Sequence, residues 1–380
     1  MKRLGITVSY PKEVILIKIV CIAWLIAKVL SFKVWISDRY FPVVPVVDSL
    51  TLPNEFHLFL FFISLLGITS AFFYPNKKGI LISVIVIEVA SCVLDYMRWQ
   101  PWEYQYLLTF VFFLFSKDRK QFLFLLTFLI AVTYIFSGIH KFSGSFLYSF
   151  WDRTILHNLL HLPYRIIKIP ILHYSGLILA AIEIFIGVGI LFSRHRRSIS
   201  FLAILMHLFI VILYGPFGLN HNIIIFPWNL AMIALVMVLF YKNSLSNFTV
   251  SFFKSKLNSI VFLLIGVMPI FSLFGKWDDY LSFNLYSGNI KTLAICVEEV
   301  PEYPELEKYK SGVKSNRYCK DAYLINTTTW ALEELKVPVY PQERVFKMLQ
   351  DQFNIKYPNV KNTFVYYWYP YQNENLKEVR

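Results

Sequence analysis

The segment "YIFSGIHKFSG", residues 134–144, ends a long apolar run and places two basic side chains, His140 and Lys141, next to each other. The run begins near residue 121 and is long enough to cross a membrane. A lysine at this position can extend its amine to the lipid headgroups. A lysine buried there in its neutral form can instead act as a base. The segment by itself is compatible with both roles.

The composition places the chain among membrane proteins. Hydrophobic residues make up 57% of the 380 residues and charged residues only 16%, against roughly a quarter in soluble domains. The net charge is +13, but the basic residues stand in short clusters between apolar runs. Membrane topology explains that placement better than a nucleic acid does. We therefore expect a lipid bilayer around the chain and no nucleic-acid partner.

Residues 1–276 are predicted to form an all-α polytopic membrane domain. A spanning helix needs about 20 mostly apolar residues, and nine stretches approach this. The amphipathic stretch 145–170 is expected to lie at the membrane interface. The nine stretches are 14–32, 55–74, 79–96, 101–116, 121–141, 173–192, 198–214, 222–241 and 257–275.

The connectors between these stretches alternate in charge. One set carries 14 basic residues and the opposite set carries 7, although the opposite set is longer in total. Because basic residues are enriched in cytoplasmic loops, the first set is predicted to be cytoplasmic. The N-terminus is then cytoplasmic and the C-terminus extracytoplasmic.

Residues 277–380 are more polar and are predicted to form a small extracytoplasmic α+β domain. "IKTLAICVEEV", residues 290–300, alternates as a strand does, and "PQERVFKMLQDQF", residues 341–353, has helical spacing. Cys296 and Cys319 lie in this region. An oxidising compartment permits a disulfide between them, and two free buried thiols are an equally weighted alternative.

Polar residues inside the apolar stretches mark candidate site positions, because a polar group in a bilayer usually faces the protein interior. Each has an ordinary explanation when it is taken alone: His207 as a hydrogen-bonded core histidine, Glu183 as a protonated or paired packing residue. Their convergence on one membrane face predicts a cavity that opens to the outside. The residues are Arg98, Trp102, His140, Lys141, Glu183, His207, Asn220, Trp228 and Asn229.

His157 and His161 have the i, i+4 spacing of metal ligands. No third ligand follows at a recognisable spacing, so an interfacial amphipathic helix is the favoured interpretation. We expect no metal. The sequence has no P-loop, no dinucleotide-binding glycine pattern and no CxxC.

Three segments resemble the vitamin K-dependent gamma-carboxylase family, whose membrane part is the horizontally transferred transmembrane (HTTM) domain. "YIFSGIHKFSGSFL", residues 134–147, is similar to the segment around the family's catalytic lysine, which falls on Lys141, with His140 in place of a first lysine. "HLFIVILYGPFGLNHNIIIFPWNLAM", residues 207–232, is similar to later helices, with His207 at a family histidine. "DYMRWQPWEYQYLL", residues 95–108, resembles the segment before the fourth helix, with Trp102 about where the family has a histidine.

The resemblance, to a short bacterial-type member, implies a specific chemistry. Lys141 would deprotonate a reduced naphthoquinone or another membrane quinol. Oxygen would add, the quinol would become an epoxide, and the alkoxide formed would deprotonate a glutamate side chain that captures CO2. His140 and His207 would assist catalysis. The quinol would be held by Arg98, Trp102, Glu183, Asn220, Trp228 and Asn229, and the substrate would be an exported protein or peptide.

The alternative is a non-enzymatic membrane scaffold, similar to the small four-helix, redox-associated membrane proteins (DoxX/MauE-like). Such a protein would contact an exported partner through residues 277–380. The surroundings of Lys141 separate the two hypotheses. An enzyme needs the amine in a closed apolar pocket, and a snorkelling lysine would lie among headgroups.

Overall fold

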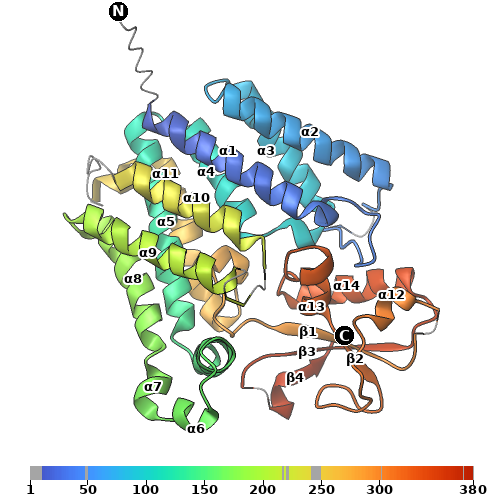
Figure 1. Cartoon of the computed structure of the whole chain (residues 1–380). Coiled ribbons are helices and arrows are strands. Elements are labelled where there is room, and N and C mark those ends of the chain that lie inside the picture. Colours follow the sequence, from blue (N-terminus) through green and yellow to red (C-terminus); the bar gives the residue numbers. More distant parts are fainter. Residues whose placement is uncertain are drawn as a thin grey trace, which may run out of the picture.

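A computed structural model describes residues 11–47, 50–215, 218–219, 222–240, 250–300, 302–370 and 372–379. The chain forms a helical bundle with a small domain of strands and helices against one end (Figure 1). Asn220, one of the candidate site residues, lies outside the described residues.

The bundle is built from long apolar helices joined by short connections. Its helices are α1 (Lys12–Leu30), α2 (Asn54–Phe73), α3 (Lys78–Val93), α4 (Pro101–Phe115), α5 (Arg119–Lys141), α8 (Leu177–Phe192), α9 (Arg196–Tyr214) and α10 (Ile225–Phe240). A last apolar segment comprises α11 (Lys256–Val261), η5 (Phe262–Val267) and η6 (Met268–Phe274). Shorter elements of the membrane part are η1 (Phe32–Trp35), η2 (Tyr96–Arg98), η3 (Phe146–Leu159), α6 (Tyr164–Ile167), α7 (Pro170–Tyr174) and η4 (Val250–Lys254).

Five helical segments among the described residues are long and apolar enough to cross a membrane, which marks a multi-pass membrane protein. They are Asn54–Phe73, Arg119–Lys141, Pro170–Phe192, Arg196–Tyr214 and Lys256–Phe274. The nine expected spans are therefore not confirmed in number. Helices α3, α4 and α10 have only 16, 15 and 16 residues. Helix α1 has 19 residues, but four of them are charged.

Helix α5 is the centre of the bundle. In its most apolar stretch 78% of the residues are buried, against 22–39% in the other four segments. Two glycines let α8 approach it closely. A Cβ atom on Gly138 would lie 2.7 Å from the Ala180 carbonyl oxygen, and one on Gly187 would lie 2.5 Å from the Ala131 carbonyl oxygen. Small residues allow such close packing between membrane helices.

The region expected at the membrane interface folds as several short helices rather than one. The π-helix η3 covers residues 146–159, α6 and α7 follow, and α7 leads into α8. Ile171, which is 82% exposed, and the half-exposed Tyr164 and Tyr174 line the outside of this region. Exposed apolar and aromatic side chains of this kind suit a headgroup environment.

The C-terminal domain contains an antiparallel sheet in the order β2-β1-β3-β4, as the α+β prediction required. The strands are β1 (Thr292–Val297), β2 (Tyr323–Asn326), β3 (Asn362–Tyr367) and β4 (Leu376–Glu378), and the helices are η7 (Tyr280–Ser282), α12 (Pro304–Glu307), α13 (Thr327–Glu334), α14 (Glu343–Lys356) and η8 (Asn373–Asn375). The predicted strand and helix correspond to β1 and α14. Helix α14 buries Val345, Phe346, Leu349 and Phe353, which share one face.

This domain docks on the loops at one end of the bundle. The carboxylate of Glu334 accepts hydrogen bonds from the backbone N–H groups of Tyr40 (2.6 Å) and Phe41 (2.9 Å). The ring of Phe41 meets that of Trp330 edge to face. The side-chain amide of Gln100 donates to the Pro338 carbonyl oxygen at 3.2 Å. Polar and aromatic contacts together therefore fix the domain against the membrane part.

The four cysteines divide into one pair and two single thiols. Cys296 and Cys319 form a disulfide with a Cα–Cα distance of 5.4 Å, which decides between the two alternatives for these residues. Cys21 and Cys92 are free and buried.

We predict that alkylation in denaturant without reductant modifies two cysteines, and alkylation after reduction modifies four. Mass spectrometry counts them. Replacing Cys296 and Cys319 by alanine should lower the free energy of unfolding by about 2–4 kcal/mol, because the crosslink restrains the unfolded chain. Replacing Cys21 by alanine tests the loss of a buried thiol without a crosslink. Four alkylated cysteines in unreduced protein would rule out the bond.

A second prediction concerns the ion pair between Lys28 in α1 and Glu88 in α3, whose side chains are fully buried at an N–O distance of 2.7 Å. Lys28→Met alone should destabilise the protein by about 3–5 kcal/mol, because it leaves a buried carboxylate without its partner. Lys28→Met combined with Glu88→Met should recover most of that loss.

Denaturant unfolding in detergent measures both variants. Lys347→Met, which removes an exposed pair with Asp351 in α14, is the matched control and should change stability by less than about 1 kcal/mol. A double variant as unstable as Lys28→Met alone would show that the loss does not come from the buried carboxylate left without its partner.

Candidate functional site

Lys141 lies with its amine in a cavity at the end of α5. Tyr134, Ser137 and Lys141 follow one another at i, i+3 and i+7, so they share one face of this helix. That face lines a mostly apolar cavity of about 110 Å³, bounded also by α8, α9 and α10. We call it the inner cavity. Lys141 is only 6% exposed, so the lysine is buried rather than extended to the headgroups.

The amine of Lys141 has three polar contacts. It donates to the hydroxyl of Ser137 at 2.6 Å, to the Ser137 carbonyl oxygen at 3.3 Å and to Oε2 of Glu183 at 2.9 Å. Three contacts match the three donors of an ammonium group. The close approach of α8 at Gly138 brings Glu183 within this distance. Lys141 and Glu183 therefore form a pair of opposite charges in apolar surroundings.

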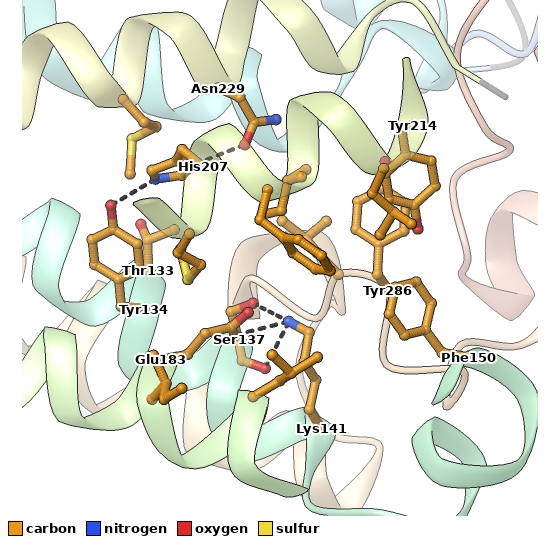
Figure 2. A pocket seen from close by; sticks show the side chains of 18 of the residues that line it. Thr133, Tyr134, Ser137, Lys141, Phe150, Glu183, His207, Tyr214, Asn229 and Tyr286 are labelled. Carbon is orange, nitrogen blue, oxygen red and sulfur yellow. Dashed lines mark hydrogen bonds and ion pairs between the residues drawn. The ribbon is translucent and has the colours of Figure 1, made fainter. Parts of the chain in front are cut away.

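A second polar chain faces the first across the cavity (Figure 2). Nδ2 of Asn229 donates to the Ile225 carbonyl oxygen at 2.8 Å, which leaves its Oδ1 to accept from Nδ1 of His207 at 2.7 Å. Because Nδ1 then carries the proton, Nε2 of His207 accepts from the hydroxyl of Tyr134 at 2.6 Å. The Tyr134 oxygen keeps accepting capacity on the side of the cavity.

The remaining walls are apolar and aromatic. Figure 2 shows Phe150, Tyr214 and Tyr286 together on one side, away from both polar groups. The rings of Tyr214 and Tyr286 are 5.0 Å apart. The indole N–H of Trp228 donates to Gln105 at 2.6 Å. Trp228 therefore has its polar atom satisfied and offers a ring face to the cavity.

A larger cavity, the interdomain chamber, lies between the bundle and the C-terminal domain. Its volume is about 290 Å³, and it is lined by residues of α4, α10, β1 and α13. Trp228, Leu285 and Tyr286 line both cavities. Trp102 lines the interdomain chamber and not the inner cavity, and its buried N–H has no hydrogen-bond partner within the described part of the chain.

The candidate residues from the sequence thus separate into groups. Lys141, Glu183, His207, Trp228 and Asn229 line the inner cavity, and Trp102 lines the adjoining chamber.

His140 and Arg98 line neither cavity. Nε2 of His140 lies 3.2 Å from the hydroxyl of Ser272, on another side of α5. The guanidinium of Arg98 is fully buried in a separate polar network, where it lies 2.7 Å from Nδ1 of His57 and 2.8 Å from the Ser91 carbonyl oxygen.

Sequence reasoning did not single out Tyr134 and Ser137. Both stand in the segment "YIFSGIHKFSG", and their helical spacing from Lys141 is the signal that could have found them. Leu285 and Tyr286 lie in the linker, residues 283–291, which joins η7 to β1. No pattern in the sequence predicts that they line a cavity.

His157, one of the two histidines at metal-ligand spacing, has protein partners. Its ring stacks on that of Tyr164, and its Nδ1 lies 3.1 Å from the Leu162 carbonyl oxygen. The described residues contain no group of three or more His, Cys, Asp and Glu side chains that could hold a metal ion.

The inner cavity thus presents two acid–base groups to one mostly apolar space. A carboxylate beside an ammonium can accept a proton while the cation stabilises the anion that forms. The Tyr134–His207–Asn229 chain can accept a second proton at a different place. Comparison of the whole chain with protein-family models, with curated proteins and with solved structures finds no match.

Proposed function

We propose that this protein is a membrane enzyme that removes protons from a flat, apolar molecule with two hydroxyl groups. A membrane quinol fits this description, and it is also what the resemblance to the vitamin K-dependent gamma-carboxylase family implies. The observation that carries the proposal is the presence of two separate proton-accepting groups on facing walls of one apolar cavity. Ion pairs that serve stability alone, such as Lys28–Glu88, need no cavity beside them.

The first proton goes to Glu183 and Lys141 acting as a pair. The carboxylate of Glu183 accepts it, and the ammonium of Lys141 remains beside the oxygen that has become negative. The apolar walls strengthen this attraction, because few other dipoles compete for the charge. This division of roles differs from the expectation of Lys141 as the base by itself. We assign the proton to Glu183 because the amine of Lys141 donates in three contacts, as an ammonium group does, and an ammonium group has no lone pair to accept a proton.

The second proton passes through Tyr134. Its hydroxyl already donates to Nε2 of His207. When the Tyr134 oxygen accepts a proton from the ligand, it can therefore pass its own proton to the histidine. Asn229 holds the Nδ1–H tautomer that keeps Nε2 free to accept. His207 is therefore the terminal acceptor and Asn229 a positioning residue.

A reduced quinone would supply the acidic hydroxyl groups, and dioxygen, the oxidant that the resemblance implies, would accept the two electrons that the oxidation of the quinol releases. Lys141 and Glu183 would hold one end of it, Tyr134 the other, and Trp228 and Phe150 would contact its ring. The inner cavity is smaller than the roughly 150 Å³ that accommodates a single benzene ring in an engineered protein. A two-ring quinol therefore needs space beyond it.

We also propose that nine segments cross the bilayer and that the C-terminal domain is extracytoplasmic. The four segments that are short or charged occur in the described structure as helices at the expected positions. The buried charge of α1 at Lys28 is paired with Glu88, which lowers its cost in a membrane. A disulfide in the C-terminal domain suits an oxidising compartment.

If the protein is a non-enzymatic scaffold, Lys141 and Glu183 serve only the packing of α5 against α8. In that case conservative changes in the inner cavity would alter stability and no reaction, and an exported partner would bind the C-terminal domain. The variants below separate the two functions.

Glu183→Gln and Lys141→Met should each lower the rate of naphthoquinol oxidation at least about 100-fold, because each removes one half of the proton-accepting pair. Lys141→Arg should keep a measurable fraction of the rate, because arginine supplies the positive charge without being a base. The measurement is the disappearance of a reduced naphthoquinone with the protein in nanodiscs. Lys276→Met, a change outside the cavity, should leave the rate unchanged.

A wild-type rate in Glu183→Gln together with an inactive Lys141→Arg would show that Lys141 is the base by itself. Wild-type rates in all the cavity variants, or no reaction with the unaltered protein, would contradict the proposed enzyme.

Alkaline phosphatase fused after Arg380 should be active, because the proposed topology places this end outside the cytoplasm. A fusion after Lys117, in the connector between α4 and α5, should be inactive and is the matched control. A well-expressed but inactive fusion after Arg380 would overturn the orientation.

A further inference from the structure

We propose that the interdomain chamber is the entrance and outer half of the substrate site. The side chain of Tyr286 separates it from the inner cavity and moves to connect the two. The ligand that the site would take is an apolar ring compound, larger than one ring, with a hydrogen-bond acceptor on the part that stays in the chamber. The ligand class rests on the proposed function, and the route itself does not.

The first argument is the shared wall. The inner cavity and the interdomain chamber have Trp228, Leu285 and Tyr286 in common. Tyr286 is 37% exposed and borders both cavities, so its ring is not packed on every side. A change in the position of this one side chain would join the two spaces.

The second argument is the way in which the linker that carries Tyr286 is fixed. Gly288 has a φ of +67°, and a Cβ atom there would lie 2.7 Å from the Ser145 carbonyl oxygen. The hydroxyl of Ser145 donates to the Ser287 carbonyl oxygen at 3.2 Å. The backbone is therefore held against η3, while Tyr286 itself has a φ of +52°, which a non-glycine residue seldom adopts. An anchored backbone with a strained tyrosine beside it is typical of functional positions.

The third argument is the chemistry of the chamber. Its wall includes Trp102, which is 3% exposed and whose N–H has no partner in the described structure. A buried N–H donor is costly unless it is paired. A carbonyl or hydroxyl oxygen on a ligand in the chamber would satisfy it. Aromatic neighbours, Tyr280 and Phe346 among them, suit a flat ring.

The fourth argument is size. A volume of about 110 Å³ accommodates only part of a two-ring compound, whereas the adjoining 290 Å³ accommodates the rest. A ligand whose reacting end lies between Lys141 and Tyr134 would thus extend past Tyr286 toward Trp102.

The structure also offers a route into the inner cavity from the lipid side. Phe209 of α9 lines the inner cavity and is 42% exposed on the outside of the bundle, so a ligand could instead enter from the lipid between α8 and α9.

The test of the route uses no substrate. Thr133→Cys places a thiol in the inner cavity, in a protein whose Cys21 and Cys92 are replaced by alanine, and its reaction rate with N-ethylmaleimide is measured in nanodiscs. Thr328→Trp, which fills the chamber from α13, should slow that reaction at least tenfold. Leu205→Trp adds bulk one turn from Phe209 on the exposed face of α9 and lines neither cavity, so it should leave the rate unchanged.

Leu332→Trp, one turn further along α13 and also in the chamber wall, serves as a second plug and should act as Thr328→Trp does. A plug that misfolds the protein would raise the reactivity of the thiol, so misfolding cannot imitate the expected slowing. An unchanged rate in both plugged variants, or slowing by Leu205→Trp alone, would overturn the proposal.

The ligand class is tested by binding of 6-hydroxy-1,4-naphthoquinone, whose second ring carries a hydroxyl oxygen, and of 1,4-naphthoquinone, whose second ring carries none; neither compound needs to react. Trp102→Phe removes the N–H and keeps a ring. It should weaken binding of the hydroxylated naphthoquinone about fivefold, the equivalent of one hydrogen bond, without affecting 1,4-naphthoquinone. Trp277→Phe is the matched control, because that indole N–H is also buried and without a partner among the described residues but lines neither cavity.

Equal weakening by both tryptophan changes, or none by Trp102→Phe, would contradict a ligand contact at Trp102. If neither quinone binds while the plugs still slow the thiol reaction, the quinol function fails and the route through the chamber stands.

Discussion

The close contact between α5 and α8 is the constraint on which the candidate site depends. Gly138 and Gly187 remove the two Cβ atoms that would hold the helices apart. Only at this separation does Glu183 on α8 reach the amine of Lys141 on α5 at 2.9 Å. Larger residues at the two glycines would part the helices and leave a lysine and a glutamate buried without partners. A backbone contact therefore decides whether the charges are tolerated in the membrane.

Burial by itself does not distinguish the site from the rest of the bundle. Lys28 with Glu88 and Arg39 with Asp95 are buried more completely than Lys141 with Glu183. These other pairs lie in networks that line neither cavity. Lys141 and Glu183 differ because they border a cavity. Ion pairs of both kinds neutralise charge in apolar surroundings, but only a pair beside a cavity can exchange a proton with a bound molecule.

The C-terminal domain takes part in the site as well as covering one end of the bundle. Its linker supplies Leu285 and Tyr286 to the inner cavity, and β1 and α13 supply walls of the interdomain chamber. Contacts such as Glu334 with the backbone of Tyr40 and Phe41 hold the domain in this position. Loosening the docking would therefore change the shape of the chamber, which links the stability of the domain to the access of ligands.

Composition and hydrophobic patterning predicted the membrane class, the positions of the apolar helices and the mixed strand and helix content of residues 277–380. They also predicted the convergence of Lys141, Glu183, His207 and Asn229. These features follow from local composition and periodicity, because a bilayer requires long apolar helices and excludes unpaired polar groups. The tertiary structure decided which polar residues share a cavity. It placed His140 and Arg98 elsewhere, added Tyr134 and Ser137, and brought in Tyr286 from the linker. Tyr134 and Ser137 follow from helical spacing once Lys141 is known to face a cavity. The places of His140, Arg98 and Tyr286 depend on helix rotation and on contacts between residues far apart in the chain, which no local pattern in one sequence records.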